Sequence, residues 1–443
     1  MSRSLPQANR RGFLAASARG AAGVVVATAA GSRSYATAAN ERVSLALIGC
    51  GGMGSGHLAA LFREQLPVEL SYLCDLDPAQ LDTARDKAGQ QSANRPQCVE
   101  EFRRVLDDPS VDAVLVATPH HWHAPIALAA LQAGKDVYLE KPASHVFREG
   151  RLLIDAAKKY GRIVQHGTQM RSSAVTQEAR QVLDSGLLGP IQVAKAWNCQ
   201  NRGPCESVAD GQPPAGVDYD AWLGPAPARA FNERRFHRTW RQFRDYGNGD
   251  FGDDGAHDVD MARWALGVDA HPIRVTARGS SVRPAGYSEF PDNMLVAFDY
   301  PDGRMLVYED RLFTPYGQLG VDSGNAFYGT EGYMVFSRRG FFRTYLGRKE
   351  EPGPASGKSG RVGTPVPTHL ADFFHSVRTR AQPKADVEQA HLSCALIHLG
   401  EIAFRTQQVL HFDPVAEQIT NSAEANALLT KEYRAPYGLP DVV

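Results

Sequence analysis

A glycine-rich turn between a strand-like and a helix-like segment constrains the fold of this 443-residue chain more than any other feature. The apolar run 43–48 is followed by the pattern G-x-G-x-x-G at Gly49, Gly51 and Gly54, and then by a helical pattern over 55–62. In that context the glycines allow a tight turn, a close approach of a pyrophosphate and close helix–strand packing, and the helix N-terminus faces the phosphates. The pattern predicts a unit that binds a dinucleotide; a turn with only a packing role is the alternative.

An acidic residue ends the next strand-like segment, where dinucleotide-binding folds use one. Asp75 closes the run 68–75, and its carboxylate there would accept hydrogen bonds from both ribose hydroxyls. Because a carboxylate repels a 2′-phosphate, we expect NAD as the cofactor, with NADP as the alternative.

Strand and helix patterns alternate from residue 41 to residue 168, which predicts a doubly wound parallel sheet, an α/β Rossmann domain that binds NAD(P). Helical spacing of apolar residues predicts helices over 125–133 and 147–160. The strands expected in this domain are 43–48, 68–75, 111–118, 136–140 and 163–167.

The pattern changes in residues 169–385, which predict a second α+β domain built on a large, mostly antiparallel open sheet. Pro301-Asp302-Gly303 indicates a hairpin turn. The aromatic-, proline- and arginine-rich segment 201–248 is expected to be a functional lid rather than disordered chain, and 351–363 a mobile surface loop. In the last part, 386–443, a helix over 387–407 is expected to pack back on the first domain and to be followed by a tail. The strands expected in the second domain include 191–197, 273–279, 293–300, 304–310 and 333–336.

The first 38 residues differ from the rest and resemble a twin-arginine export signal. Arg10 and Arg11 precede the mildly apolar stretch 14–30, and Ala36-Thr37-Ala38 offers a small-x-small cleavage pattern. We therefore expect cleavage near Ala38 and a periplasmic mature protein that folds and loads its cofactor before export. A disordered basic leader is the alternative.

Composition excludes several classes of partner. The net charge is −1, with 22% charged residues and no basic block, which gives no support for nucleic acid or an anionic membrane as a partner. No apolar run predicts a stable membrane-spanning helix. Six cysteines do not form a disulfide framework in a chain of this size. Cys199 and Cys205 could pair in an oxidising compartment, or remain two buried thiols.

Lys141, Asp253 and His257 are the candidates for catalysis. Lys141 follows the predicted strand 136–140 at its carboxyl end, the edge of such a sheet where ligands bind. A lysine beside the positive charge of an oxidised nicotinamide should have a lowered pKa and could move a proton near neutrality. Asp253 and His257 are four residues apart, which places them on one face of a helix and predicts a carboxylate–imidazole–ammonium cluster. A solvated lysine and a satisfied core histidine are the alternatives.

Further polar and aromatic residues are candidates for substrate contacts. His121 and His123 alternate and could bind zinc with a carboxylate, but they lead into a helix at the nucleotide edge, so we expect no metal. The polar residues 165–169 and Arg171 could hydrogen-bond the hydroxyls of a substrate, or could only join the two domains. The aromatic side chains that could pack against a sugar or the cofactor are Trp122, Trp240 and Tyr246; core filling is the alternative for the last two.

Together these motifs resemble the Gfo/Idh/MocA oxidoreductases, which are named for glucose–fructose oxidoreductase, inositol dehydrogenase and a rhizopine-catabolism protein. The resemblance rests on the glycine motif, Asp75, Thr118-Pro119 with His123, Glu140-Lys141-Pro142, and the run 253–260, and it covers nearly the whole mature chain. It implies NAD(P)-linked chemistry on sugars or cyclitols, and a homodimer or homotetramer formed through the second domain's sheet.

The resemblance also implies residue roles. It places His123 near the nicotinamide, holds the peptide before Pro142 in cis, and gives His257 contact with the reacting hydroxyl, with Asp253 positioning the hydroxyls or the lysine. Asp254 is an acid where the family commonly has an apolar or neutral residue, and we count it with the substrate residues. The residues expected to bind the cofactor are Gly49, Gly51, Gly52, Met53, Gly54, Asp75, Thr118, Pro119, His123, Glu140, Lys141 and Gln169.

These observations predict an exported carbohydrate oxidoreductase in which Lys141 acts as acid and base on a sugar or polyol hydroxyl. Because an exported enzyme has no free nicotinamide pool, the NAD is expected to stay bound and to be re-oxidised in place. One alternative is a glycoside hydrolase that uses bound NAD for transient oxidation and elimination, with Tyr246, His237 or Asp254 as the additional base. The other is an inactive sugar-binding protein.

Overall fold

The structure, a computed structural model, describes residues 42–91, 95–202, 208–237, 239–283, 288–356, 365–440 and 443. The expected export signal, 1–38, lies outside the described residues, and so does Cys205, the candidate partner of Cys199. Within the described ranges, no helix has the length and apolar character needed to cross a membrane.

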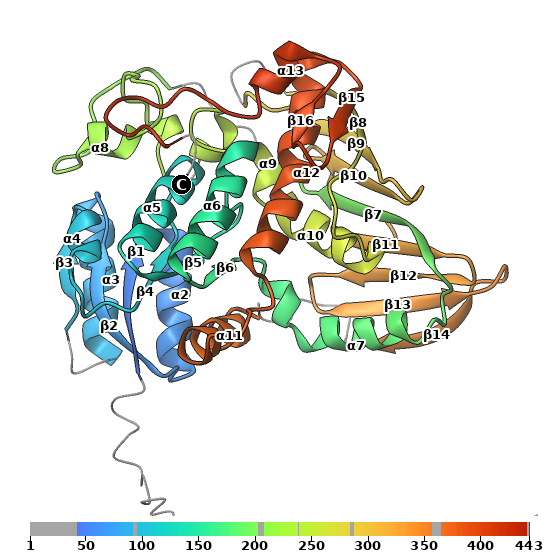
Figure 1. Ribbon diagram of the computed structural model, residues 1–443, viewed down its shortest axis with the longest axis horizontal. Helices are drawn as coiled ribbons and strands as arrows, with labels where there is room; N and C mark the ends of the chain where they lie inside the picture. The colour runs from blue at the N-terminus through green and yellow to red at the C-terminus, as the bar shows by residue number, and fades with distance from the viewer. Residues whose placement is uncertain are drawn as a thin grey trace, which may run out of the picture. The chain divides into compact units, whose positions relative to one another are not determined.

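The first sheet is parallel and six-stranded, in the order β3-β2-β1-β4-β5-β6 (Figure 1). Reversal of the strand order on either side of β1 creates the crevice at the carboxyl ends where doubly wound sheets bind ligands. The predicted Rossmann architecture is therefore confirmed. Its strands are β1 (Val43–Ile48), β2 (Val68–Cys74), β3 (Gln97–Val99), β4 (Ala113–Val116), β5 (Asp136–Leu139) and β6 (Val164–His166).

Helices cover both faces of this sheet because its central strands are apolar on both sides. One face packs on α2 (Gly52–Arg63), α3 (Pro78–Gln91) and α11 (Val366–Thr379). The other packs on α4 (Arg103–Leu106), α5 (His120–Gln132) and α6 (Phe147–Tyr160). α5 begins five residues before the predicted helix start, with Pro125 in its second turn. Helix α11 lies in the part of the sequence assigned to the second domain, yet it packs on the first sheet.

The second sheet has ten strands in the order β14-β13-β12-β11-β7-β10-β9-β8-β15-β16, and all pairs except β7–β10 are antiparallel. This confirms the predicted mostly antiparallel sheet. The strands are β7 (Ile191–Cys199), β8 (Arg274–Ser280), β9 (Asn293–Asp299), β10 (Met305–Arg311), β11 (Ser323–Gly329), β12 (Gly332–Ser337), β13 (Phe341–Leu346), β14 (Glu351–Ser356), β15 (Leu410–Asp413) and β16 (Gln418–Ile419).

Two local expectations have opposite outcomes. The turn at Pro301-Asp302-Gly303 joins the antiparallel strands β9 and β10, as predicted. The segment 351–363, expected to be a mobile loop, instead begins with β14, which pairs with β13; its residues 357–363 lie outside the described residues. Its proline- and glycine-rich sequence is tolerated because β14 is an edge strand, where a missing N–H costs no ladder bond.

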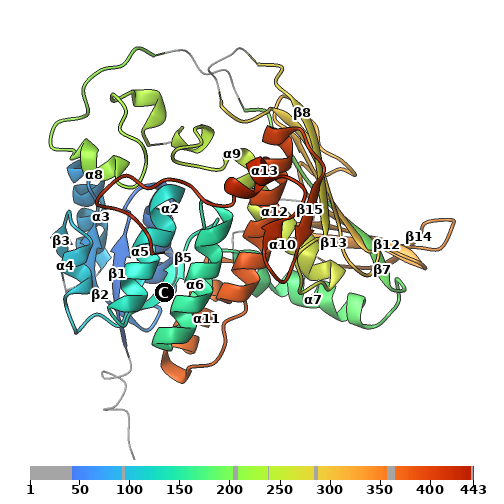
Figure 2. The same ribbon diagram turned by 45° about the horizontal axis from the view of Figure 1, so that its top comes forward.

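One face of the second sheet is covered by α7 (Ala174–Asp184), α10 (Gly255–Leu266) and α12 (Val387–Thr406) (Figures 1 and 2). On α12, Ala390 and Cys394 belong to the first domain's core, whereas the residues from Ala395 onward belong to the second domain's core. The same helix therefore packs against both sheets. After α13 (Ala423–Ala427), the chain crosses back over the first domain, where Tyr437 and Leu439 pack beside α5.

Candidate active site

A cavity of about 670 Å³ opens at the carboxyl ends of β1, β2, β4 and β5. Its volume is within the range of cofactor and ligand sites. The first sheet and its loops form one wall. The other wall consists of residues from the segment 221–241, including α8 (Tyr219–Leu223), together with Tyr437 of the tail. The predicted lid segment thus lies across the nucleotide crevice.

The glycine turn leaves open space where a pyrophosphate would lie. Gly49 has φ +92°, and a Cβ there would be 2.7 Å from the backbone of Ala117. At Gly54 a Cβ would be 1.9 Å from the Gly49 carbonyl oxygen, so this glycine permits close packing of α2 on β1. A Cβ at Gly51 or Gly52 would meet nothing within 4 Å. α2 begins at Gly52 without a side-chain cap, which leaves its first N–H groups directed at this space.

Asp75 lines the cavity directly after β2 and is fixed by backbone donors. Its two carboxylate oxygens accept hydrogen bonds from the N–H groups of Cys50, at 2.6 Å, and Asp77, at 2.9 Å. Burial raises the pKa of Asp75, and these two hydrogen bonds oppose that shift. Each carboxylate oxygen keeps a further lone pair that a ribose hydroxyl could use.

The loop after β4 and the start of α5 form the middle of the cavity. Thr118, Pro119, His120 and His123 line it. Within the described part of the chain, the buried Thr118 Oγ1 has no hydrogen-bond partner. The imidazole of His123 extends from the Pro142 carbonyl oxygen, at 2.7 Å, to that of Thr118, at 2.8 Å, so this ring joins the loops after β4 and β5.

Glu140 and Lys141 follow β5 and have different environments. Glu140 is buried and accepts hydrogen bonds from His57 Nε2, at 2.7 Å, and Gln169 Nε2, at 2.9 Å. Burial opposes its ionisation, but the hydrogen bond from His57 and nearby positive charge outweigh burial and lower the pKa of Glu140 to about 2. The Lys141–Pro142 peptide is cis, as the resemblance implied.

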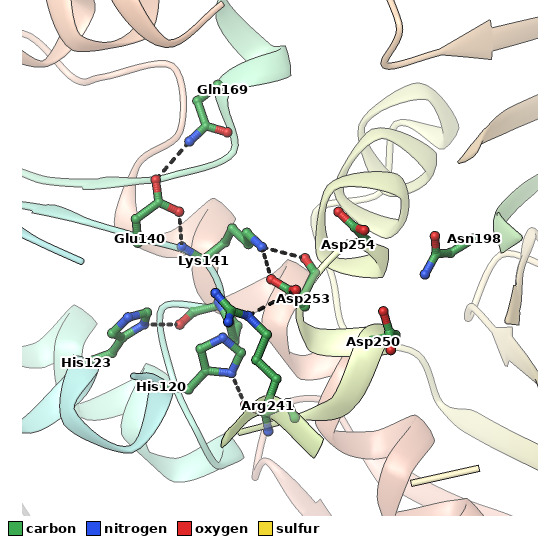
Figure 3. A network of polar contacts seen from close by, with 12 residues as sticks. His120, His123, Glu140, Lys141, Gln169, Asn198, Arg241, Asp250, Asp253 and Asp254 are labelled. Carbon is green, nitrogen blue, oxygen red and sulfur yellow. Dashed lines mark hydrogen bonds and ion pairs between the residues drawn. The ribbon is translucent and has the colours of Figure 1, made fainter. Parts of the chain in front are cut away.

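Lys141 extends across the cavity to the second domain (Figure 3). Its Nζ donates to the Asp253 carbonyl oxygen at 2.9 Å and forms an ion pair with the Asp253 carboxylate. Arg241 Nε lies 3.0 Å from the other carboxylate oxygen of Asp253. Burial opposes ionisation of Asp253, but the charges of Lys141 and Arg241 outweigh it and hold its pKa well below the usual range. Asp253 is therefore a carboxylate clamped between two cations.

Of the three predicted catalytic residues, His257 differs most from its predicted position relative to the other two. Asp253 lies between α9 (Gly249–Gly252) and α10 rather than on the same helical turn as His257, so the helix-face prediction is wrong for this pair. Burial, followed by the positive charges of Lys141 and Arg338, lowers the pKa of His257 to about 3. Its buried Nδ1 has no hydrogen-bond partner within the described residues. His257 is thus a neutral imidazole near Lys141, without a direct hydrogen bond to it.

The nucleotide edge of this cavity fits NAD. A dinucleotide would place its pyrophosphate in the open space at Gly51 and Gly52, facing the uncapped helix N-terminus. The carboxylate after β2 and the unpartnered Thr118 hydroxyl are free to hydrogen-bond to it. Comparison with known proteins agrees. Residues 43–168 match the profile described as oxidoreductase family, NAD-binding Rossmann fold, and residues 172–313 and 359–439 match that of the C-terminal alpha/beta domain. The chain belongs to the Gfo/Idh/MocA oxidoreductase family.

Curated relatives in this family include dehydrogenases of polyols and sugars. Inositol 2-dehydrogenase 2 of Saccharopolyspora erythraea is 27% identical over 278 residues, which span 62% of this chain and 68% of that protein. Levoglucosan dehydrogenase of Pseudarthrobacter phenanthrenivorans is 26% identical over 235 residues, or 51% of this chain and 52% of the relative. The cofactor predicted from the sequence, NAD, is the one that the family's Rossmann domain binds.

Solved structures share the two-domain fold. The aldose–aldose oxidoreductase of Caulobacter crescentus, solved with glycerol, superposes with a TM-score of 0.65 at 21% identity, covering 84% of this chain and 100% of that one. A levoglucosan dehydrogenase solved with NADH and levoglucosan gives a TM-score of 0.62 at 20% identity, covering 83% and 99%.

Several of the site residues predicted from the sequence lie away from the cavity. Arg171 is buried in a bidentate ion pair with Asp260 of α10, its NH2 group 2.8 Å from Oδ1, so the structure gives it the domain-joining role. Gln169 donates to Glu140 and does not line the cavity. Tyr246 is fully buried against His121 and Trp222, which is the core-filling alternative. Trp122 and Trp240 line the cavity, where Arg241 stacks on Trp240 with its guanidinium carbon 4.3 Å from the ring centre.

Asp254 belongs to a charged array behind Asp253. It accepts a hydrogen bond from Gln200 at 2.6 Å and forms ion pairs with Arg202, at 2.8 Å, and Arg338, at 2.9 Å. Burial opposes its ionisation, but the charge of Arg338 helps to hold the pKa of Asp254 below the usual range. Figure 3 shows Asp250, Asp253 and Asp254 grouped where α9 meets α10.

Several residues of the site were not anticipated. Arg241, His120 and Tyr437 line the cavity. Arg241 lies in the aromatic lid segment, and His120 directly precedes His121, so their positions were indicated but their roles were not. Tyr437 stacks edge-on to Trp122, with ring centres 5.3 Å apart. It lies in the tail, and no local sequence signal brings that tail back to the nucleotide crevice.

Proposed function

We propose that this protein is an NAD-dependent carbohydrate oxidoreductase that oxidises a secondary hydroxyl of a sugar, glycoside or polyol. The observation that supports this most directly is the position of Lys141. It lies in the same cavity as the glycine turn, at the carboxyl end of a parallel strand, with its Nζ held by a residue of the second domain. Relatives named for inositol and levoglucosan indicate the substrate class.

In this proposal the Lys141 ammonium group first loses a proton to solvent, and its neutral Nζ then accepts the proton of the reacting hydroxyl; a bound nicotinamide would accept the hydride. The Asp253 carboxylate is already placed to stabilise the charge that the lysine gains. Arg241 holds that carboxylate from the other side and so limits its rotation. His257 is a neutral imidazole near Lys141 but is not among the residues that line the cavity, so its predicted contact with the substrate oxygen stays part of the proposal. In the reverse reaction Lys141 returns the proton.

Contacts of the lid segment across the crevice support a cofactor that stays bound between turnovers. The lid segment lines the crevice opposite the first sheet, and His237 Nε2 lies 3.0 Å from the Asp77 carboxylate in the loop after β2. Retained NAD would suit the export that Arg10 and Arg11 suggest, because the periplasm has no free nicotinamide pool. We further propose signal cleavage near Ala38 and assembly of a homodimer or homotetramer through the outer face of the second sheet, where Leu295 and Tyr328 are exposed.

The redox hydrolase is less well supported. Of the three bases suggested for it, Tyr246 is enclosed in an aromatic cluster, His237 is paired with Asp77, and Asp254 is held by two arginines. A binding protein without chemistry has no evident use for the Lys141–Asp253 contact.

The test is to denature the purified native protein, identify any released nucleotide by mass, and then incubate the native protein with a panel of polyols and glycosides. Reduction of bound NAD together with formation of a keto product would support the proposal. Cleavage of a glycoside without net reduction would favour the hydrolase. A protein that contains no nucleotide and gains no stability from added NAD would contradict both.

A further inference from the structure

His120 lines the cavity but has no role in the proposed proton transfer. It is the first residue of α5, is 2% exposed, and lines the same cavity as Lys141, Asp253 and Arg241. Its ring packs edge-on against Trp240, with the ring centres 4.6 Å apart, which limits its rotation. The ring is therefore held in one orientation on the Lys141 side of the cavity (Figure 3).

The hydrogen-bond network determines which ring nitrogen of His120 holds the proton. Asn248 donates from Nδ2 to the His145 carbonyl oxygen at 2.9 Å, which fixes the orientation of the amide. Its Oδ1 then faces His120 Nδ1 at 3.1 Å. Because an amide oxygen can only accept, His120 Nδ1 must donate, and the neutral imidazole has its lone pair on Nε2.

The surroundings of His120 keep the ring neutral. Burial, followed by the positive charges around the ring, including those of Arg241 and Lys141, holds the pKa of His120 well below its usual range. In the described part of the chain, no protein group donates to Nε2. The nearby Asp253 carboxylate already accepts from Lys141 and Arg241. His120 Nε2 is therefore an unused hydrogen-bond acceptor at the Lys141 end of the cavity.

We propose that His120 Nε2 accepts a hydrogen bond from a second hydroxyl of the substrate, adjacent to the hydroxyl that Lys141 deprotonates. The enzyme would then select vicinal diols over isolated alcohols, with Asn248 as the residue that positions the acceptor. This rests on the proposed oxidation of a hydroxyl at Lys141. A buried acceptor left without its donor costs binding energy, so a substrate without the second hydroxyl binds less tightly.

The test compares D-glucose and myo-inositol with their monodeoxy and monodeoxyfluoro analogues, in the wild type, in His120→Phe, and in His375→Phe, an exposed position on α11 that serves as the matched control. Reduction of bound NAD gives kcat/KM, and calorimetric titration of the NADH-loaded protein gives binding without turnover. We expect one deoxy position to lose roughly 10-fold in the wild type. Fluorine should not restore it, because fluorine cannot donate. In His120→Phe the parent compound should already show this loss, and removing the hydroxyl should add nothing.

Losses that multiply between His120→Phe and the deoxy analogue would overturn the proposal, as would recovery by the fluoro analogue. Loss of bound NAD in His120→Phe with unchanged discrimination would assign the residue to the cofactor instead, and so would also overturn it. If no probe reduces bound NAD, the proposed oxidation fails, and the calorimetric comparison still decides on His120. Absence of binding by every probe would contradict both.

Discussion

In the glycine turn, a larger side chain at Gly54 should lower the stability of the fold, whereas one at Gly51 should prevent NAD binding. Gly54→Ala places a Cβ 1.9 Å from the Gly49 carbonyl oxygen, so the backbone of α2 must move away from β1. Overpacking of this kind costs about 3 kcal/mol. For an unfolding entropy of about 2 cal/mol/K per residue over roughly 400 residues, that cost corresponds to a decrease in Tm of about 4 °C, with or without NAD.

Gly51→Val should behave differently. Gly51 has φ −65° and no atom within 4 Å of a Cβ, so the fold has room for the side chain. The added methyl groups occupy the space in which the pyrophosphate would lie. We expect a nucleotide-free Tm close to that of the wild type, loss of the co-purifying NAD, and loss of the stabilisation by added NAD. That stabilisation is about 2.7 kcal/mol, or about 3 °C, at 100 times the Kd.

The assay is thermal unfolding of stripped and NAD-loaded protein, combined with mass identification of the bound nucleotide. Gly56→Ala is a suitable control, because its Cβ also meets nothing within 4 Å and Gly56 does not line the cavity. If Gly51→Val retained wild-type NAD, the assignment of the open space to the pyrophosphate would be wrong. If Gly54→Ala kept the wild-type Tm, the close-packing argument would be wrong.

Three further predictions concern chemistry, pH and export. Lys141→Ala should lower kcat by about 10²–10⁴ while bound NAD stays at the wild-type amount, measured by single-turnover reduction; equal loss of NAD would mean a structural role. Burial lowers the pKa of several histidines to about 3 or 4, so below about pH 6.5 the unfolded chain binds protons that the folded chain does not. The free energy of unfolding should then fall by about 2 kcal/mol per histidine between pH 7 and pH 5, and a flat dependence of Tm on pH would contradict this. The histidines concerned in this pH prediction are His121, His257, His398, His166, His369 and His391. Replacing Arg10 and Arg11 by lysine should leave the protein in the cytoplasm, which fractionation checks.

Sequence patterns predicted the fold well where local signals are strong. The strand 43–48, the helix 147–160 and the hairpin at residues 301–303 agree with the structure because hydrophobic periodicity and turn chemistry act over a few neighbouring residues. β14 was not predicted, because its pairing depends on β13 rather than on the propensity of its own proline- and glycine-rich sequence.

The site was predictable at the level of motifs and less so at the level of contacts. Lys141 and Asp253 came from separate motifs, and only the fold brings their side chains together across the domain boundary. Arg171 shows the converse. Its place after a strand suggested a ligand contact, but a buried aspartate on α10 pairs with it. A sequence gives no direct sign of which buried partner a charged side chain will find, because the partner is 89 residues away along the chain.

Three contacts of the lid segment bear on the proposal that NAD stays bound between turnovers. Residues of this segment contribute to three parts of the site: His237 contacts the loop after β2, Trp240 packs on His120, and Arg241 holds Asp253. If release of NAD requires this segment to move, all three contacts break together. In that case cofactor release would also disassemble the catalytic end of the cavity, and the proposed turnover with bound NAD would keep Asp253 and His120 in place. A soluble NAD⁺ pool would then be unnecessary for activity, provided that a second carbonyl substrate re-oxidises the cofactor in the closed site.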